Sequence, residues 1–306
     1  GQFLEMWSIL GELNDFTIVE QGANDGQLAR DVIMALAGTP LESARWIIVE
    51  PLESLRVKQS HLLANAHVCW VSSSYYLPPF CGVHFSNELF DALPFDIIEA
   101  HDGKWRELLV GSQGEDFVFC PNPNFIVGTP LPPRPDGFLT ECRQGQKELF
   151  QGVSSAMQKG FLLAIDYGMP CEDFLADHRS KGTLACYSKH RRDENPLTHP
   201  GQKDITAHVD FSSLARDANA VGMSLSGFTD QHHFLVGAAT NLLQSMDGKK
   251  PSPVMLKKLR SLRMLLHPET MGAQFKVILF SKDAPESKQP SGFLHAKDPG
   301  YLLENP

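Results

Sequence analysis

Two carboxylates and two glycines near the start of the chain have the spacing of a cofactor-binding loop. In the segment FTIVEQGANDGQL (16–28), an apolar run ends in Glu20 and turns through Gly22 and Gly26 into a helical pattern. A pyrophosphate would meet like charge from Glu20 and Asp25, so a cofactor without phosphate fits better than a dinucleotide. S-adenosylmethionine is such a cofactor, because its ammonium can pair with Glu20 while the glycines allow close backbone approach. A plain glycine turn between a strand and a helix would have the same pattern.

Another acid ends the next apolar run, as Glu20 ends the first. Glu50 lies 24 residues beyond Gly26, where α/β nucleotide sites place a carboxylate that accepts both ribose hydroxyls. Polar side chains also follow the third and fourth apolar runs, and ligands bind beyond the carboxyl ends of such strands. We therefore predict cofactor contacts from the loop and from these strand ends: Glu20, Gly22, Ala23, Asn24, Gly26, Glu50, Pro51, Ser72, Ser73 and Asn87. The serines and Asn87 could equally satisfy local backbone groups in turns.

The segment FSNELFDALP (85–94) gathers Asn87, Glu88 and Asp91 at the end of a strand. Paired carboxylates suit a cation. A guanidinium keeps its proton and offers a planar fork of donors, so as a methyl acceptor it would need acids to orient it and to hold charge on its far nitrogens. We predict that these three residues are catalytic. Helix capping by Asp91, or simple solvation of the acids, is the alternative.

Two later segments could contact the acceptor. Residues 166–168 (DYG) end the fifth apolar run, and the segment DITAHVD (204–210) is dense in polar groups. A turn would also explain the first segment, and capping of a helix by Asp204 or Asp210 would explain the second. The predicted substrate-binding residues are Asp166, Tyr167, His190, Asp204, Thr206 and His208.

The elements that must position these residues alternate along the chain. Apolar, strand-like runs are separated by segments with helical spacing, such as 28–36 and 52–63. This alternation predicts an α/β fold with a parallel sheet and short crossovers. The expected strands are 16–20, 45–50, 68–72, 83–87 and 160–166, followed by 224–228 and 275–281, with later helices over 235–243 and 255–266.

The middle of the chain does not continue this alternation of strands and helices. Strand-like runs at 96–100, 105–110 and 117–120, with turns at 102–103 and 111–114, predict a small antiparallel excursion. A Pro-rich stretch, 121–135, precedes a long amphipathic segment, 138–157. Residues 167–207 are polar and irregular, as in a lid over a substrate site. The tail from Lys282 onward is expected to pack poorly.

Composition restricts the class of protein. The chain has 306 residues, is 42% hydrophobic and carries a formal charge of −9, which is typical of a globular protein and disfavours a nonspecific nucleic-acid binder. No apolar run is long enough to cross a bilayer and no export signal opens the chain. Six scattered cysteines without a CxxC pair or clustered histidines predict no metal site and a reducing compartment.

Taken together, the motifs resemble the MidA-like methyltransferases, a family that includes a mitochondrial complex I assembly factor which methylates an arginine. The resemblance covers most of the chain and is carried most specifically by NELFDALP, IDYG and DITAHVDF. It implies a Rossmann-like class I methyltransferase fold, with a mostly parallel seven-stranded sheet, one antiparallel strand at 275–281 and family-specific insertions. It also implies S-adenosylmethionine as cofactor, with Glu20, Gly22, Gly26 and Glu50 around it and Asn87 and Glu88 facing the acceptor.

One position departs from the family pattern. Relatives commonly carry a glycine where this chain has Asn24. Asparagine is the side chain that best tolerates a left-handed backbone, so we expect cofactor binding to survive.

The resemblance implies a division of the chain and an activity. The expected parts are a cofactor-binding half (1–100), an antiparallel insertion (101–135), a core helix and strand (136–166), a lid (167–207), the C-terminal half of the core (208–282) and a tail (283–306). The expected activity is methyl transfer to a protein arginine, in the cytoplasm or, in a eukaryote, the mitochondrial matrix, with no nucleic-acid or membrane partner. A noncatalytic assembly factor that binds S-adenosylmethionine and a nicotinamide-dependent oxidoreductase are the alternatives.

Overall fold

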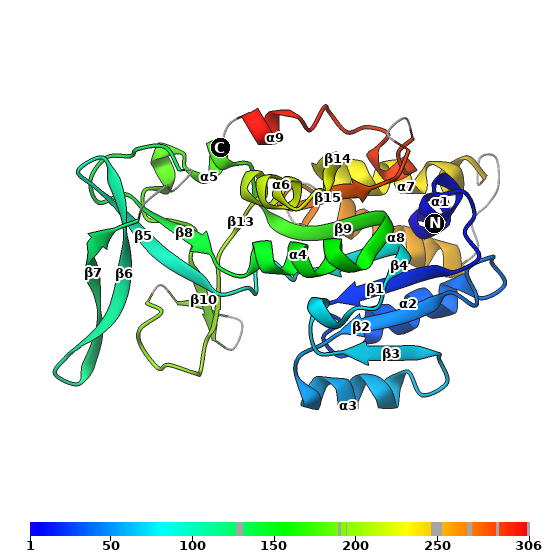
Figure 1. Cartoon of the computed structure of the whole chain (residues 1–306), viewed down its shortest axis with the longest axis horizontal. Helices are drawn as coiled ribbons and strands as arrows, with labels where there is room; N and C mark the ends of the chain where they lie inside the picture. The colour runs from blue at the N-terminus through cyan, green and yellow to red at the C-terminus, as the bar shows by residue number, and fades with distance from the viewer. Residues whose placement is uncertain are drawn as a thin grey trace. The chain divides into compact units, whose positions relative to one another are not determined.

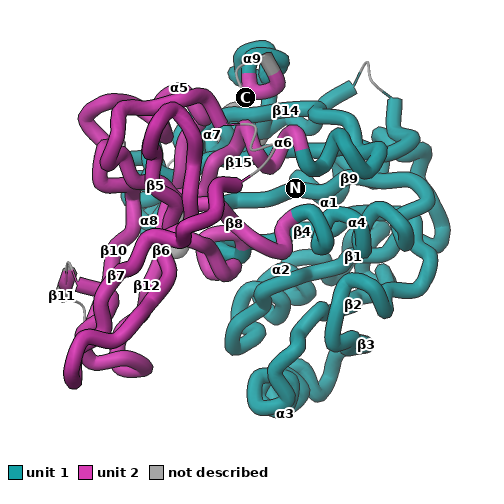
Figure 2. The backbone as a smooth tube through the Cα atoms, turned by 60° about the vertical axis from the view of Figure 1, so that its left-hand side comes forward, with its two compact units in different colours: residues 1–89, 147–167, 217–301 teal, residues 90–146, 168–216, 302–306 magenta. Residues whose placement is uncertain are grey.

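The chain folds into two compact units, shown in teal and magenta in Figure 2. The computed structural model describes residues 1–126, 131–188, 191–193, 195–245, 253–267, 271–285 and 288–304. The first unit comprises residues 1–89, 147–167 and 217–301, and the second comprises 90–146, 168–216 and 302–306. The chain therefore leaves the first unit and returns to it twice.

A mostly parallel sheet forms the centre of the first unit (Figure 1). Its strand order is β14-β15-β9-β4-β1-β2-β3, and every neighbouring pair from β9 to β3 is parallel. β15 is antiparallel to both of its neighbours, which confirms the expected fold class and its antiparallel strand. The strands are β1 (Phe16–Gln21), β2 (Arg45–Val49), β3 (Val68–Val71), β4 (Phe80–Asn87), β9 (Met157–Met169), β14 (Ser224–Asp230) and β15 (Phe275–Lys282).

Helices cover both faces of this sheet. On one face, Ile18 and Phe85 belong to a buried cluster that also contains Met6 of α1 and Phe234 of α7. On the other face, the ring of Phe280 in β15 lies 5.4 Å from that of Phe150 in α4. Each such side chain contributes about 1.5–3 kcal/mol when fully buried. The helices of the first unit are α1 (Gln2–Ile9), α2 (Gln27–Leu36), α3 (Glu53–Leu62), α4 (Gln146–Ala156), α7 (Gln231–Ser245) and α8 (Pro253–Leu266), with the 3-10 turns η1 (Ser74–Tyr76) and η4 (Ser291–Phe293).

Two predicted elements differ in extent from the structure. The amphipathic segment 138–157 is not one helix, because its first part forms strand β8 (Leu139–Arg143), which pairs with β5. A short apolar run fits the spacing of apolar residues in either a helix or a strand. Here, pairing with β5 makes residues 139–143 a strand. Strand β9 also continues to Met169, so residues 166–168 lie inside a strand and the turn explanation for them is wrong.

The tail is better packed than its sequence indicates. Phe293 is 2% exposed, and its ring lies 5.4 Å from that of Phe234 in α7. The backbone N–H and hydroxyl of Ser291 donate to the two carboxylate oxygens of Glu5 in α1, at 2.5 and 2.8 Å. The expectation of a poorly packed tail is therefore wrong for these residues. Packing between ends that are far apart in sequence has no local signature.

The second unit contains two small antiparallel sheets. The larger has the order β7-β6-β5-β8 and confirms the predicted excursion, although β7 extends through Pro121 and Pro123 as an edge strand, where proline is tolerated. The smaller, β11-β10-β12, gives the expected lid more order than its sequence predicts. The bounds are β5 (Phe95–His101), β6 (Lys104–Gln113), β7 (Asp116–Phe125), β10 (Ala185–Ser188), β11 (Arg191–Asp193), β12 (Asp204–Thr206), β13 (Val209–Asp210), α5 (Cys171–Phe174), η2 (Asp177–Arg179), α6 (Phe211–Ala220) and α9 (Tyr301–Glu304).

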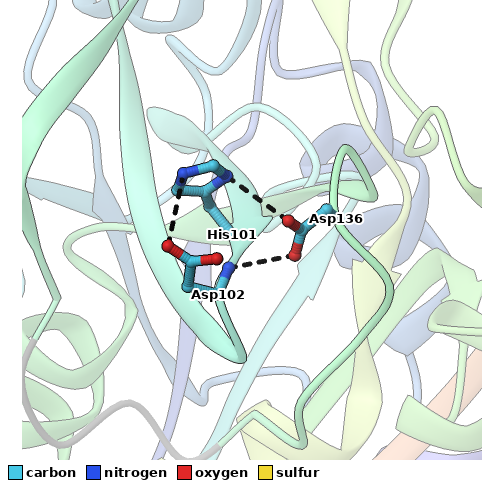
Figure 3. Close-up of side chains that lie close together, drawn as sticks. All are labelled: His101, Asp102 and Asp136. Carbon is cyan, nitrogen blue, oxygen red and sulfur yellow. Dashed lines mark hydrogen bonds and ion pairs between the residues drawn. The ribbon is translucent and has the colours of Figure 1, made fainter.

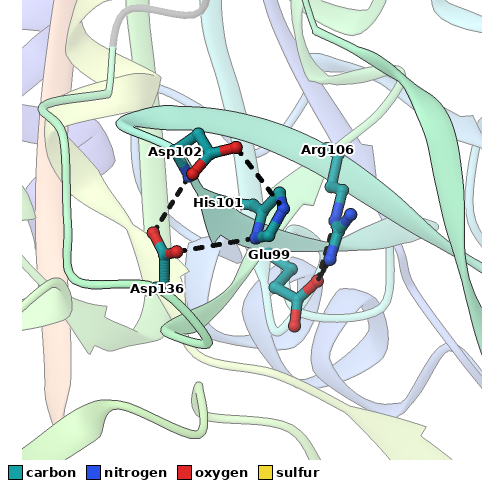
Figure 4. A network of polar contacts seen from close by, with 5 residues as sticks. All are labelled: Glu99, His101, Asp102, Arg106 and Asp136. Atoms are coloured by element: carbon teal, nitrogen blue, oxygen red, sulfur yellow. Dashed lines mark hydrogen bonds and ion pairs between the residues drawn. The ribbon is translucent and has the colours of Figure 1, made fainter.

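Ionic contacts hold the β5–β6 hairpin (Figure 4). Arg106 donates twice to one carboxylate oxygen of Glu99 on the paired strand, at 2.7 and 2.9 Å. At the turn, the imidazole of His101 lies between Asp136, 3.6 Å from Nδ1, and Asp102, 3.7 Å from Nε2 (Figure 3).

These three side chains could in principle hold a metal ion, because their ligand atoms lie within 4.8 Å of one another. However, the two carboxylates face different ring nitrogens of His101, and a single ion could use only one of these. Asp136 also accepts the backbone N–H of Asp102 at 2.9 Å. The imidazole therefore lies between two acids, and the contacts of Asp136 with it and with the backbone of Asp102 fix the turn. Among the described residues, no helix combines the length and the apolar character that crossing a membrane requires.

Candidate functional site

The loop after β1 has the backbone shape that its glycines predict. Gly22 and Gly26 have φ angles of +81° and +85°. Asn24 has a φ of +48°, which confirms that asparagine adopts the left-handed conformation here. The loop therefore presents its backbone without side chains at two of these three positions.

Gly26 also lies against α3. A Cβ atom at Gly26 would stand 3.3 Å from Cγ of Gln59, which is tighter than ordinary van der Waals contact. Gly26 begins α2 as its N-cap, so the close approach of the loop to α3 sets where α2 begins. Any side chain at Gly26 would strain the backbone and press on Gln59.

Glu20 is buried with unused hydrogen-bonding capacity. The residue is 2% exposed, and within the described part of the chain its Oε2 has no hydrogen-bond partner. Burial raises the pKa of Glu20 to about 7, and the nearby indole N–H of Trp46 opposes this shift only in part. An orphaned buried carboxylate oxygen costs free energy unless a donor reaches it. A ligand ammonium would supply that donor.

Glu50 is held in place from both sides. Its Oε1 accepts the backbone N–H of Leu52 at 2.9 Å, and its Oε2 accepts Nε2 of Gln59 at 3.3 Å. Each oxygen can accept a second hydrogen bond, so the carboxylate retains capacity for a pair of hydroxyls. The residue follows β2 at the carboxyl edge of the sheet, as predicted.

Gln59 is a residue of this site that sequence reasoning treated only as part of a helix face. It is fully buried, and its Nε2 also donates to the carbonyl of Asn24 at 2.8 Å, while its Oε1 accepts Nε1 of Trp70 at 2.9 Å. Gln59 thus joins the first loop to the second strand end. A glutamine at an apolar position of an amphipathic helix was the available signal.

The other predicted cofactor residues lie at the same edge of the sheet. Ser73 accepts the backbone N–H of Tyr75 at 3.3 Å as the N-cap of η1, so turn chemistry accounts for its hydroxyl. Pro51 and Ser72 are exposed, whereas Ala23 is buried. Parallel strands place all of these residues beyond the carboxyl ends of β1, β2 and β3.

Glu88 follows β4 in an unusual conformation. Its φ is +51°, and its backbone N–H donates to the carbonyl of Ile165 in β9 at 2.9 Å. Nδ2 of Asn87 donates to Oε1 of Glu88 at 3.1 Å, and the Glu88 side chain is exposed. A non-glycine residue in this region costs roughly 1 kcal/mol or more, and such residues gather at functional sites.

Asp91 belongs to the second unit, where it meets another predicted residue. Oγ1 of Thr206, in β12, donates to Oδ2 of Asp91 at 3.2 Å. The two residues are 115 positions apart, so only the fold brings them together. The described residues 91–94 form a turn that leads directly into β5, so helix capping does not explain Asp91.

Arg143 positions the segments that carry these residues, and the sequence analysis missed it. Its guanidinium donates to the carbonyls of Phe90 at 2.7 Å and of His208 at 2.6 Å, and also to the carbonyl of Ala207. An arginine has five donors in a rigid fork, which suits several carbonyls at once. Arg143 therefore ties the residue before Asp91 to the loop after Thr206.

The remaining predicted residues have diverse environments. Asp166 is fully buried and accepts the backbone N–H of Tyr167 at 2.9 Å. Tyr167 is half-buried and packs edge-on against Phe275, with ring centroids 5.7 Å apart. Asp204 is exposed on β12, and His190 lies outside the described residues. Asp210, in contrast, accepts the N–H of Ser212 at 2.9 Å and caps α6, as the capping alternative predicted for it.

Comparison with known proteins identifies the cofactor class. Residues 1–229 match the family model described as "Putative S-adenosyl-L-methionine-dependent methyltransferase". The chain belongs to this family. The first unit accordingly has the class I methyltransferase fold, and S-adenosylmethionine is the cofactor of this methyltransferase.

Two groups of relatives support the assignment. A crystal structure of a protein from Burkholderia thailandensis bound to S-adenosyl-homocysteine is 27% identical to this methyltransferase, with a TM-score of 0.83. The match covers 98% of this chain and 79% of the other. The mitochondrial protein arginine methyltransferase NDUFAF7 of Danio rerio is 25% identical over 90% of this chain and 72% of its own length. The Drosophila melanogaster homologue of that protein is 26% identical, over 89% of this chain and 69% of its own length.

The residues of the methyltransferase fit this cofactor. When bound, S-adenosylmethionine supplies an electrophilic methyl group. The orphaned oxygen of Glu20 suits its ammonium, the loop from Gly22 to Gly26 suits close backbone contact, and the carboxylate of Glu50 suits the ribose hydroxyls. The family assignment favours this cofactor over the nicotinamide alternative.

Proposed function

We propose that this chain transfers the methyl group of S-adenosylmethionine to a side-chain nitrogen of an arginine in a protein substrate. The proposal is carried by the likeness to NDUFAF7 proteins, which are named protein arginine methyltransferases, over about nine-tenths of this chain. The anionic side chains at the carboxyl edge of the sheet support it, because the acceptor is a cation.

Glu88 is the residue best suited to orient the acceptor. Its carboxylate is exposed at the end of β4, and only Oε1 is engaged by Asn87. A guanidinium can donate two parallel hydrogen bonds to such a carboxylate, which fixes the plane of the acceptor and draws its positive charge toward Glu88. The nitrogen that turns toward the methyl donor then has the electron density needed for in-line displacement. The proton released from that nitrogen passes to water or to an acid of the site.

Asp91 and Thr206, which share a hydrogen bond, are also proposed to bind the substrate. The hydrogen bond between them holds the carboxylate of Asp91 in one orientation, and Arg143 fixes the backbone on both sides. Asp166, Tyr167, His190, Asp204 and His208 remain proposed substrate residues on the basis of sequence. The formal charge of −9 favours a cationic protein partner over a nucleic acid. In a eukaryotic source, we propose the mitochondrial matrix as the compartment.

One experiment tests the activity. The purified protein is incubated with radioactive S-adenosylmethionine and a lysate from a strain that lacks the gene, and labelled proteins are digested and identified by mass spectrometry. We expect methylarginine in a defined substrate. Labelling confined to lysine or to small molecules would refute the proposed acceptor. Binding of S-adenosyl-homocysteine without any methyl incorporation would favour the alternative of a noncatalytic assembly factor.

A further inference from the structure

Glu141 is a buried acid of the second unit that has no part in the site described above. It lies in β8 and is 6% exposed. Its Oε1 accepts the backbone N–H groups of Thr183 and Leu184, both at 2.7 Å, and its Oε2 accepts the hydroxyl of Thr183 at 3.0 Å. Glycine at position 182 allows this approach, because its φ is +75° and a Cβ there would stand 2.5 Å from Oε1. Both oxygens of a buried carboxylate therefore bind one short segment of the chain.

The donors determine the chemistry of this link. The backbone N–H of His208 donates to Oγ1 of Thr183 at 3.0 Å, so the hydroxyl accepts there and gives its own proton to Glu141. These contacts bring donors to both ends of Glu141, and only a carboxylate accepts at both ends. Burial raises the pKa of Glu141, but its donors and the nearby charge of Arg143 favour the ionised form. A glutamine would place an NH2 group opposite at least one of the donors.

Thr183 links Glu141 to the segment that carries Thr206. Its hydroxyl binds the N–H of His208, which lies two residues beyond Thr206. Strand β10 begins two residues after Thr183, at Ala185, and Ala185 pairs with Thr206 in β12. Groups that depend on Glu141 therefore hold Thr206 through the chain that follows it and through the strand beside it.

Arg143 binds the same segment from the same face of β8. Side chains two positions apart on a strand point to the same side, so Glu141 and Arg143 share a face. The guanidinium donates to the carbonyl of His208 at 2.6 Å and to that of Phe90 at 2.7 Å. The carbonyl of His208 is thus bound by Arg143 directly, and its N–H is bound by Glu141 through Thr183. One face of β8 holds both polar groups of this peptide backbone.

We propose that Glu141 is a positioning residue for the methyl acceptor, and that it acts through Thr183 on the pair formed by Asp91 and Thr206. Without this link, residues 206–208 lose one of their anchors, and Oγ1 of Thr206 no longer holds the carboxylate of Asp91 at 3.2 Å in a single orientation. A carboxylate with more freedom loses more entropy when it binds a guanidinium, so the affinity for the acceptor falls. The inference rests on the proposed function, because it takes Asp91 and Thr206 to bind the acceptor.

Matched substitutions of Thr183 test the link. Thr183→Val keeps the shape of the side chain but leaves the N–H of His208 and Oε2 of Glu141 without this partner, whereas Thr183→Ser keeps the hydroxyl. The probe is a lysate from a strain that lacks the gene, supplied at increasing protein concentration with radioactive S-adenosylmethionine. We expect Thr183→Val and Glu141→Gln to raise the half-saturating lysate concentration ~10-fold, with the maximal rate and the affinity for S-adenosyl-homocysteine within about twofold of wild type. Thr183→Ser should resemble the wild-type protein.

Glu99→Gln controls for a general loss of stability in the second unit. It removes a carboxylate that pairs with Arg106 in the sheet that contains β8 (Figure 4). This variant should keep the half-saturating concentration within about twofold of the wild-type value. A rise as large as that in Thr183→Val would overturn the inference, because any weakening of the second unit would then suffice.

Hydrogen exchange measures the positioning without methyl transfer. With S-adenosyl-homocysteine bound, the amides of residues 91–93 and 204–206 should exchange ~10-fold faster in Thr183→Val than in the wild-type protein, while those of β6 keep their rates. Unchanged exchange in both segments, or an unchanged half-saturating concentration, would overturn the inference and leave the proposed function intact. No methyl transfer by the wild-type protein would refute the proposed function and the role of Glu141 in acceptor binding together.

Discussion

The carboxamide of Gln59 hydrogen-bonds the carboxylate of Glu50, with 3.3 Å between Nε2 and Oε2. The same nitrogen donates to the carbonyl of Asn24, so one side chain connects the two loops assigned to the cofactor. Their separation therefore depends on a helix residue that need not touch the ligand.

Gln59→Leu should weaken cofactor binding and destabilise the fold. The substitution leaves the carbonyl of Asn24 and the indole N–H of Trp70 without their partner, which costs about 1–3 kcal/mol of the free energy of unfolding. We expect calorimetry to show a roughly tenfold loss of affinity for S-adenosyl-homocysteine. Gln151→Leu, an exposed glutamine on α4, is the matched control and should change neither quantity. Unchanged affinity in Gln59→Leu would show that the loops do not need this link.

The affinity for S-adenosyl-homocysteine should rise with pH until Glu20 is ionised. Burial raises the pKa of Glu20 to about 7, so below pH 7 the carboxyl is largely neutral and pairs poorly with the ligand ammonium. Well below that pKa, the affinity should fall up to ~10-fold for each pH unit. Glu20→Gln should bind weakly at every pH between 5 and 7, without this slope. The same slope in the variant would exclude Glu20 as the ammonium partner.

The cofactor-free protein should lose stability as pH rises past the ordinary pKa of glutamate. Because the folded-state pKa of Glu20 is raised from 4.5 to about 7, the folded state binds more protons in this interval and its advantage is lost as pH rises through it. The expected contribution is about 3 kcal/mol between the two values. Denaturant unfolding at pH 5 and pH 7 measures it, and Glu20→Gln should remove this component.

Glu88→Gln should separate cofactor binding from transfer. The amide keeps the size of the side chain and its hydrogen bond with Asn87, but it cannot stabilise a guanidinium charge. We expect the affinity for S-adenosyl-homocysteine to change less than about twofold and methyl transfer to fall by ~100-fold or more. Glu53→Gln, an exposed acid at the start of α3, controls for charge and should remain active. Equal activity in the two variants would remove Glu88 from the mechanism.

Arg143→Ala should destabilise the second unit. Three backbone carbonyls, those of Phe90, Ala207 and His208, would lose their donor. A loss of about 3 kcal/mol in the free energy of unfolding follows from the cost of unsatisfied buried groups. Arg143→Lys should recover only part of it, because lysine lacks the planar fork. Arg30→Ala, which removes an exposed ion pair, should cost less than about 0.5 kcal/mol.

Asn24 offers a test of the loop backbone. Asn24→Gly should preserve affinity for S-adenosyl-homocysteine, because glycine adopts a φ of +48° without strain. Asn24→Val should weaken binding by about 1–2 kcal/mol, since a β-branched residue resists the left-handed region. Similar affinities for the two variants, measured by calorimetry, would mean that the loop changes shape when the ligand binds.

The sequence by itself determined the parallel sheet, its antiparallel strand and the loop after β1. Alternating apolar runs report burial directly, and Gly22, Asn24 and Gly26 report a local backbone conformation that few other residues adopt. These features depend on neighbours along the chain. The site residues themselves stay predictions, although the structure places Glu20 and Glu50 at the edge where they were expected.

Only the tertiary structure decided which distant residues meet. Thr206 donates a hydrogen bond to Asp91, and Arg143 donates to the carbonyls of Phe90 and Ala207, the chain neighbours of these two residues. These contacts form because segments far apart in sequence pack together in the second unit. Gln59 likewise gains its role from the loop that α3 packs against. Residues 139–143 became a strand and the tail became buried for the same reason. Partners that are distant in sequence satisfy hydrogen bonds and cover apolar surface. The local sequence around a residue does not show which distant residues those partners are.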